Sequence, residues 1–283
     1  MKILLIGEGH GFQALVDGFS KSKYQISVLS ELNDKSNTDT DFKVISSNLS
    51  PELASEFNYV ISSGYRKWIP TDTLSESTFI NIHYALFPKY RGMHSIVWAI
   101  LNGESNVGVT VHLMDEGLDS GPIIWQKSIE VLDKSSWELM LVCDQLVTSR
   151  IDRVIEDYIE GDNQAIPQNE LDAFYVGKRN RKDCQINWDT WDVITFERAL
   201  KALVAPYPLP FFEFLGKHFE IANAEIIKRN YIEINGHVVH ISRNFVQIKI
   251  PGGLINVYEL IDQTGARVSA KDVLGSIGIR LAK

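Results

Sequence analysis

The chain has 283 residues, of which 45% are hydrophobic and 23% charged, and its 28 Lys and Arg face 36 Asp and Glu, for a net charge of -8. At roughly 150 residues per domain this length predicts two domains, and the composition excludes collagen-like, disordered and disulfide-scaffold proteins. No apolar run approaches the ~18 residues of a transmembrane helix or the form of a secretory signal, so we expect a cytoplasmic protein without a membrane partner.

The first half of the chain alternates strand and helix patterns. An apolar run at residues 2–6 stops at three glycines and is followed by apolar residues at helical spacing, which predicts a strand, a glycine turn and a helix. The same reasoning predicts strands at residues 2–6, 25–29, 59–62, 79–83, 107–114 and 123–131, and helices at residues 12–19, 51–57, 93–102 and 135–160. This order is typical of an α/β fold with a Rossmann-like, mostly parallel, doubly wound sheet.

The pattern changes after Gly161. Residues 162–182 are polar and predict a linker, and residues 188–204 predict one helix that ends before two prolines. Short strands at about ten-residue spacing are then expected at residues 219–227, 231–234, 238–242, 245–250 and 255–260. This rhythm favours a small antiparallel, OB-like β-barrel, and we place the domain boundary between residues 176 and 177.

Charge and cysteine placement exclude several kinds of partner. Residues 1–174 carry 13 Lys and Arg against 25 Asp and Glu, whereas residues 175–283 carry 15 against 11. An acidic body repels a polyanion, and the one basic cluster, at residues 178–182, has no interleaved aromatic residues, so we interpret it as a solvated linker and expect no nucleic-acid partner. Cys143 and Cys184 form no Cys/His cluster and are predicted to be free thiols, with no metal site.

The glycine turn matches a dinucleotide-binding fingerprint incompletely. Gly7, Gly9 and Gly11 follow the first strand, and Glu31 lies where a ribose-binding acid would be expected, but Phe12 occupies the position of the third glycine. The spacing therefore argues against NAD. The backbone N–H groups of the turn could bind some phosphate or could only turn the chain.

Three polar residues form the strongest candidate site. Asn81 and His83 lie two apart at the end of a predicted strand, so their side chains leave the same face, and Asp119 lies in a glycine-flanked loop between two later strands. If the strands are parallel neighbours, their carboxyl ends bring the three residues together. Taken singly, Asn81 could cap a turn, His83 could be a core histidine, and Asp119 could brace its own loop.

The flanks of these residues resemble those of the 10-formyltetrahydrofolate-dependent formyltransferases. The resemblance covers nearly the whole chain, including the second domain, which is similar to that of methionyl-tRNA formyltransferases and some sugar N-formyltransferases. Its motifs are Asn81-Ile-His83, Leu86 to Gly92, Asn102-Gly103, Gly108-Val-Thr110 with His112, Asp119-Ser-Gly121, Ile186-Asn-Trp188, Pro206-Tyr-Pro208 and Val246 to Gly253. It implies that Asn81, His83 and Asp119 are catalytic, that residues 1–176 form the catalytic domain, and that N10-formyltetrahydrofolate is the formyl donor.

The chemistry suits these residue types. An amine that attacks a formyl carbon gives a tetrahedral species with a negative oxygen and a positive nitrogen. Asn81 would donate to the oxygen, His83 would accept the proton of the amine, and Asp119 would orient His83 or stabilise it once protonated. The resemblance also places the folate against Trp68, Phe87, Pro88, Val109, Leu113, Asp115 and Leu118.

The acceptor is the least determined part of the function. The tRNA-acting members carry a basic insertion where residues 30–41 of this chain hold four acids and a single lysine. We therefore expect a nucleotide-linked amino sugar, by analogy with dTDP-sugar enzymes that supply bacterial surface polysaccharides. Its phosphates are expected at Gly9, His10, Gly11, Arg66, Lys67 and Arg91, although Arg66 and Lys67 could equally be solvated loop charges.

Other functions stay open at this point. A methionyl-tRNA formyltransferase and a non-catalytic nucleotide- or folate-binding module are the alternatives. Glycinamide ribonucleotide suits the chain less well, because the enzymes that use it lack a similar second domain. The resemblance also implies a homodimer.

Overall fold

The computed structural model describes residues 1–30 and 40–281 and divides into two compact units. Unit 1 comprises Met1–Ile96, Ser105–Val131 and Glu138–Lys178, and unit 2 comprises Val97–Glu104, Leu132–Trp137 and Arg179–Lys283. Unit 2 therefore takes in two short segments from the first half of the chain. The assignment of residues 1–176 and 177–283 to two functional domains stays a prediction.

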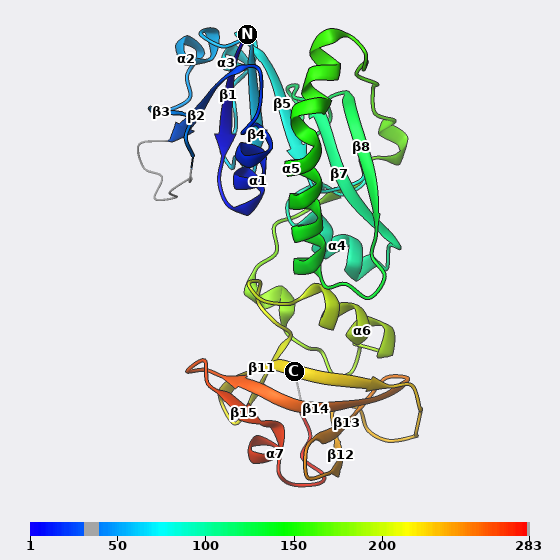
Figure 1. Cartoon of the computed structure of the whole chain (residues 1–283). Coiled ribbons are helices and arrows are strands. Elements are labelled where there is room, and N and C mark those ends of the chain that lie inside the picture. The colour runs from blue at the N-terminus through cyan, green and yellow to red at the C-terminus, as the bar shows by residue number, and fades with distance from the viewer. Residues whose placement is uncertain (31–39, 282–283) are drawn as a thin grey trace. The chain divides into compact units, whose positions relative to one another are not determined.

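A mixed sheet forms the centre of unit 1 (Figure 1). Its strands are β1 (Lys2–Gly7), β2 (Gln25–Ser30), β3 (Lys43–Ser46), β4 (Tyr59–Ser63), β5 (Thr78–His83), β7 (Asn106–Leu113) and β8 (Ile123–Glu130). Within the described residues they lie in the order β3-β2-β1-β4-β5-β7-β8. The first five pair in parallel, whereas β7 runs antiparallel to β5 and β8 antiparallel to β7. The predicted α/β class is confirmed, with an antiparallel hairpin at one edge of the sheet.

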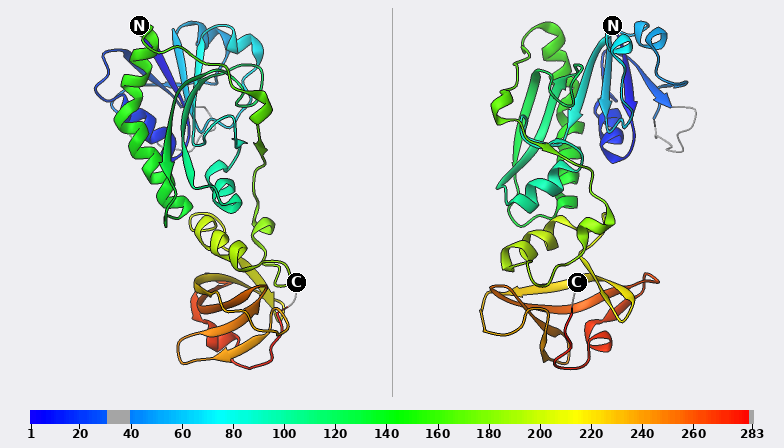
Figure 2. Two further views of the ribbon diagram at one scale, coloured as in Figure 1. Left: turned by 90° about the vertical axis from the view of Figure 1, so that its right-hand side faces the viewer. Right: turned by 180° about the vertical axis from the view of Figure 1, so that it is seen from behind.

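Helices cover both faces of this sheet. They are α1 (His10–Gly18), α2 (Pro51–Ser55), α3 (Thr71–Leu74) and α5 (Ser136–Glu160). Helix α4 (Ser95–Asn102) belongs mostly to unit 2, which takes in Val97–Glu104. Leu4 of β1 packs in one cluster with Ala54 of α2, and alternation along the strand turns its neighbours to the opposite face. On that face α1 and α5 lie together, because Thr148 Oγ1 donates to the carbonyl of Ala14 at 3.2 Å (Figures 1 and 2). None of the helices in the described ranges is both long and apolar enough to cross a membrane.

The polar segment at residues 162–182 is more ordered than a linker, which corrects the prediction. It contains the 3-10 helices η1 (Glu170–Asp172) and η2 (Arg181–Cys184) and the short strand β9 (Tyr175–Val176). Strand β9 pairs in parallel with the two-residue strand β6 (Arg91–Gly92). Ile166 also exchanges two backbone hydrogen bonds with Ile123 at the start of β8, at 2.8 and 2.9 Å. The hydrophobic pattern could not predict these elements, because hydrogen bonds stabilise them and they present no apolar face.

Unit 2 is built on a second sheet, which is antiparallel as predicted. Its strands are β10 (Phe211–Phe214), β11 (Lys217–Ile227), β12 (Val238–Ile241), β13 (Val246–Ile250), β14 (Gly253–Asp262) and β15 (Arg267–Ser269), and its helices include α6 (Val193–Ala202) and α7 (Ala270–Val273). In the described residues the order is β10-β11-β14-β13-β12, with β15 also paired to β14. The expected strand at residues 231–234 does not form. Its Ile232 is 106% exposed and packs against no apolar face.

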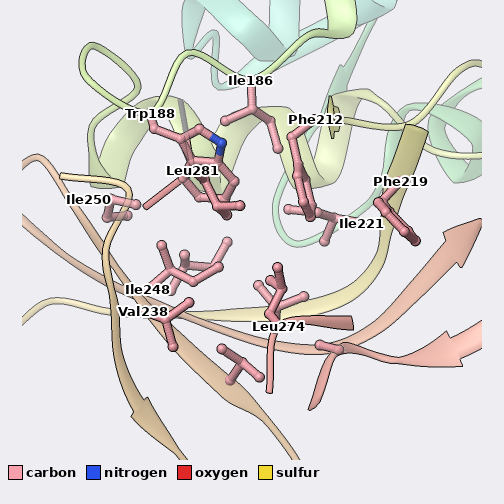
Figure 3. Packing of buried hydrophobic residues seen from close by; sticks show 14 of the residues in the cluster. Ile186, Trp188, Phe212, Phe219, Ile221, Val238, Ile248, Ile250, Leu274 and Leu281 are labelled. Atoms are coloured by element: carbon pink, nitrogen blue, oxygen red, sulfur yellow. The ribbon is translucent and has the colours of Figure 1, made fainter. Parts of the chain in front are cut away.

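The core of unit 2 gathers around Trp188 (Figure 3). Trp188 was expected within a helix that starts at its own position, but α6 begins at Val193, where Asp192 caps it by accepting a hydrogen bond from the Thr195 N–H at 2.7 Å. The indole instead lies among the aromatic and aliphatic side chains of the cluster, with Phe212 at 5.6 Å between ring centroids.

Candidate active site

Strand β5 presents Asn81 and His83 on one face of the sheet. Ile80 and Ile82 alternate with them and are buried in the core, so the two polar side chains turn to the opposite side. The antiparallel neighbour β7 places His112 directly opposite Asn81. Residues directly opposite on paired strands share a face, so a second histidine joins the pair.

Asp119 joins this group, but not by the predicted route. The prediction relied on parallel strands, whereas β5 and β7 are antiparallel, so the loop after β7 starts beside the middle of β5. A hydrogen bond from the Leu113 N–H to the Pro122 carbonyl at 2.9 Å closes this loop. Asp119 then lies with its Oδ2 3.6 Å from His83 Nδ1.

Two further contacts fix the Asp119 carboxylate. Oδ2 accepts a hydrogen bond from the backbone N–H of Gly92 at 2.8 Å, and Oδ1 lies 3.8 Å from His112 Nε2. The backbone of Asp119 has φ +54°, in the left-handed region. These contacts bring Asn81, His83 and Asp119 together around the contact between the His83 imidazole and the Asp119 carboxylate.

No metal site is found beside these three residues within the part of the chain that the structure describes. In the described ranges no group of three or more His, Cys, Asp or Glu could hold a metal ion.

The second ring nitrogen of His83 lies in the protein interior. Its Nε2 is buried and has no hydrogen-bond partner among the described residues. The imidazole packs on Phe87 with ring centroids 5.0 Å apart, and Phe87 also contacts His112 at 5.1 Å. A buried ring nitrogen without a partner is costly unless a ligand uses it. The orphaned Nε2 therefore fits a site that acts on a bound molecule.

His112 sets the orientation of the Asn81 amide. Burial lowers the pKa of His112 to about 4, so the ring is neutral near pH 7. Its Nδ1 lies 2.8 Å from the Leu113 carbonyl and must carry the hydrogen, which leaves Nε2 as an acceptor. That Nε2 lies 3.2 Å from Asn81 Nδ2, which donates to it. Because one N–H of the Asn81 amide is bound to His112, the direction of the other N–H is fixed as well. Sequence reasoning included His112 only as part of a motif.

The lowered pKa of His112 gives the stability of unit 1 a defined pH dependence. An unfolded histidine titrates near pH 6.5, whereas His112 in the folded protein takes up its proton only at about pH 4. Between these values the unfolded chain binds the extra proton, so the free energy of unfolding falls as the pH is lowered, by up to about 1.4 kcal/mol per pH unit. We expect native-state hydrogen exchange of β5 and β7 to show this loss between about pH 6.5 and pH 4.

A matched pair of variants isolates the contribution of His112. His112→Gln removes the titrating ring and is expected to flatten the dependence, whereas His240→Gln, which removes an exposed histidine of β12, keeps the wild-type slope. An unchanged slope in His112→Gln would assign the pH dependence to another group.

The glycine turn leads into a second histidine-carboxylate contact. A Cβ on Gly7 would lie 1.8 Å from the Ser63 carbonyl oxygen, so only glycine fits where β1 leaves the sheet. His10, in the first turn of α1, contacts Asp144 Oδ2 through Nδ1 at 2.7 Å, and Tyr84 donates to Asp144 Oδ1 at 2.6 Å. Burial, helped by Asp144, raises the pKa of Tyr84 well above its usual range, so its hydroxyl remains a donor. Neither Tyr84 nor Asp144 was predicted, because no spacing rule links them to His10.

Arg91 is not placed to bind a substrate, which corrects the prediction. Its side chain is 0% exposed. Gln168, Glu170 and Tyr175 accept hydrogen bonds from all of its guanidinium nitrogens. The guanidinium therefore has no donor left for a phosphate.

The remaining predicted binding residues lie at the surface or in the core of unit 1. Arg66 is exposed and pairs with Glu8 at 2.6 Å, and its neighbour Lys67 is exposed too. Trp68 and Leu118 are exposed apolar side chains, at 65% and 50%. The others divide by burial: Phe87 and Val109 are buried, Pro88 and Leu113 are partly buried, and Asp115 is exposed, with its Oδ1 accepting from the Gly117 N–H and the Ser120 hydroxyl.

Two family models match this chain, one on each side of residues 142–177. The model described as formyl transferase matches residues 44–141, and the model described as formyl transferase, C-terminal domain, matches residues 178–277. A methionyl-tRNA formyltransferase of Pelotomaculum thermopropionicum is 29% identical over 242 residues, which are 83% of this chain and 74% of that protein.

Solved structures share the fold. HypX from Aquifex aeolicus, crystallised with tetrahydrofolic acid, matches at TM-score 0.66 and 19% identity over 97% of this chain and 46% of its own, so this chain spans about half the length of HypX. WlaRD, a sugar 3N-formyl transferase crystallised with dTDP and 5-N-formyl-THF, matches at TM-score 0.71 and 20% identity over 94% of this chain and 99% of its own.

The folded arrangement and the two matched models define a one-carbon transferase. The chain belongs to the formyl transferase family. Members of this family are enzymes that transfer formyl groups, with N10-formyltetrahydrofolate as the donor.

Proposed function

We propose that the protein transfers the formyl group of N10-formyltetrahydrofolate to the primary amine of a nucleotide-linked amino sugar, with Asn81, His83 and Asp119 as its catalytic residues. The observation that carries this proposal is the buried, unpartnered Nε2 of His83, with the Asp119 carboxylate 3.6 Å from the other nitrogen of the same ring. This is the arrangement of a base held by an orienting acid.

Each of the three residues has one task in the proposed reaction. As the amine nitrogen bonds to the formyl carbon, His83 accepts through Nε2 the proton that the amine loses, and the Asp119 carboxylate stabilises the ring as it becomes cationic. The same proton passes to N10 of the folate when the bond between N10 and the formyl carbon breaks, so tetrahydrofolate leaves as a neutral amine. Asn81 donates its second amide N–H to the formyl oxygen as negative charge develops there. Because His112 already holds the first N–H, the Asn81 amide needs no reorientation when that charge appears.

The folate donor is proposed to lie against the apolar side chains beside these residues. Phe87 packs on the imidazoles of both His83 and His112, so a ring seated there adjoins the catalytic group. Trp68 and Leu118 offer exposed apolar surface in the same unit. Pro88, Val109, Leu113 and Asp115 complete the proposed folate set.

Charge supports a sugar acceptor over an RNA. The basic cluster at residues 178–182 is partly used within unit 2, since Arg179 lies over the Trp98 ring at 4.8 Å and Arg181 pairs with Glu220 at 2.8 Å. The sequence predicts an acidic loop at residues 30–41. Most of it, residues 31–39 including Glu31, lies outside the described residues. At the start of α1 no side chain caps the helix and no acid lies in its first turn, so Gly9, His10 and Gly11 are proposed for the phosphates.

A methionyl-tRNA formyltransferase is the second candidate. It is favoured by the identity of 29% to a protein of that name over 83% of this chain. The first proposal includes three further points, which rest on the family resemblance. They are a dTDP carrier for the sugar, a homodimer, and a division of function between residues 1–176 and 177–283.

Product analysis separates the two candidates. The protein is incubated with N10-formyltetrahydrofolate and either a panel of dTDP-, UDP- and GDP-linked amino sugars or initiator tRNA charged with methionine, and the products are weighed by mass spectrometry. We expect one amino sugar to gain a formyl group, while the matching sugar with a hydroxyl in place of the amine gains none. A formyl group on the charged tRNA alone would establish the second candidate and overturn the first.

A further inference from the structure

We propose that Gln168 is a positioning residue that holds Asp119 in place for catalysis, through a cluster that we call the latch: Arg91, Gln168, Glu170 and Tyr175. The inference rests on the proposed role of Asp119. It assigns a function to the polar segment between the two matched family models, where Gln168 lies 27 residues beyond the end of the first model at residue 141 (168 − 141).

The side-chain amide of Gln168 is fully engaged. Its Nε2 donates to the backbone carbonyls of Asp119 and Gly121, at 2.9 and 2.8 Å. Its Oε1 accepts from Nε and Nη2 of Arg91, at 3.1 and 2.8 Å. Carbonyl oxygens can only accept and a guanidinium can only donate, so the amide has one orientation. Gln168 therefore ties both sides of the Asp119 turn to Arg91.

Arg91 in turn is buried and hydrogen-bonded at every guanidinium nitrogen. Glu170 accepts from Nη1 and Nη2 at 3.0 and 2.7 Å, and the Tyr175 hydroxyl accepts from Nη1 at 2.7 Å. Together with Gln168, these acceptors account for five guanidinium hydrogen bonds, the full donor capacity of an arginine. A buried arginine that is satisfied in this way is a fixed anchor.

The backbone beside Arg91 holds the other end of Asp119. Gly92 pairs with Val176 in the β6–β9 ladder, and its N–H donates to Asp119 Oδ2 at 2.8 Å. Gly92 has φ +100°, and a Cβ there would lie 2.3 Å from the Val176 carbonyl, so glycine is required. The same short strand thus supports the carboxylate of Asp119 directly and, through Gln168, its main chain.

Asp119 needs such support because of its own backbone. A residue other than glycine at φ +54° occupies a sparsely populated conformation, which persists only where surrounding contacts impose it. Without the two bonds from Gln168 the turn is free to relax, and the carboxylate moves relative to His83. The expected consequence is slower catalysis with little change in substrate binding.

Gln168→Glu separates this role from simple anchoring of the segment. The substituted carboxylate still accepts from Arg91, but it cannot donate to the two loop carbonyls and repels them. We expect hydrogen exchange in peptides covering residues 91–93 and 113–122 to rise about tenfold, as for the loss of one to two hydrogen bonds. The amide of Phe174, which donates to the Pro88 carbonyl at 3.2 Å, is expected to stay protected. Gln168→Ala is expected to give the same rise in loop exchange. Asn169→Ala, which removes an exposed cap of η1 on the same segment, is the matched control and leaves loop exchange unchanged.

Kinetics with the acceptor found by product analysis complete the test. Gln168→Glu is expected to lower kcat about tenfold with KM for the folate unchanged, and to have no further effect in an Asp119→Asn background. Unchanged loop exchange in both Gln168 variants would overturn the latch whether or not an acceptor is known. Faster loop exchange with wild-type kcat, or an equal loss in the Asp119→Asn background, would overturn the positioning role. A wild-type rate in Asp119→Asn itself would instead remove the proposed function and leave the exchange result standing.

Discussion

Replacing His83 with alanine is expected to lower kcat for formyl transfer by about 10²- to 10⁴-fold, the range typical of a lost general base. The Nε2 of this imidazole is buried and has no hydrogen-bond partner among the described residues, and the Asp119 carboxylate lies 3.6 Å from its Nδ1. The amine acceptor would then have to lose its proton to water. Steady-state kinetics over a range of donor and acceptor concentrations measure the loss, and KM is expected to change far less than kcat.

The fold should survive this substitution. The His83 side chain is 17% exposed and lies at the end of β5, so its removal takes little from the core. The melting temperature is expected to stay close to that of the wild type, and His240→Ala, in unit 2, is expected to retain full activity. Wild-type turnover in His83→Ala would refute the assignment of the base.

Asp119→Asn is expected to lower kcat by about 10²- to 10³-fold, because it removes the charge that stabilises the protonated ring of His83. The substituted amide is almost the same size, and its oxygen can still accept from the Gly92 N–H, which lies 2.8 Å from Oδ2 in the wild type. The loop should therefore keep its conformation, and the loss should reflect charge. Single-turnover rates at saturating donor measure it without interference from product release.

A carboxylate outside the site provides the control for charge. Asp133 is 104% exposed and pairs with Lys201 at 3.1 Å, and Asp133→Asn changes the net charge by the same amount as Asp119→Asn. It is expected to leave kcat unchanged. Equal rates in the two variants would show that Asp119 does not act on His83.

Local patterns predicted the first part of the site well. Asn81 and His83 alternate with Ile80 and Ile82, and a period of two leaves no choice of face once the apolar pair is buried. The direction of β7 could not be obtained in this way. The connection between β5 and β7 contains the helix α4, and a parallel crossover also requires a helix or a segment of similar length. The sequence between the two strands is therefore compatible with either direction of β7.

The contacts that complete the site could not be predicted, because they depend on register between distant segments. His112 meets Asn81 only because those two residues pair across β5 and β7. A substrate-binding role for Arg91 was a reasonable expectation for an arginine near a catalytic motif. The residues that occupy its guanidinium, Gln168, Glu170 and Tyr175, lie more than seventy positions further along a polar segment, as their separations of 77, 79 and 84 show.

The hydrogen bonds from Gln168 to the Asp119 turn also determine when, during translation, the site can be completed. Ribosomes release a chain from its N-terminus, so every strand of the first sheet emerges before residue 168 does. A nascent polypeptide can therefore assemble that sheet while its catalytic carboxylate still lacks main-chain support. The protein therefore becomes able to catalyse its reaction only after the ribosome has translated the polar segment that follows α5 and contains Gln168.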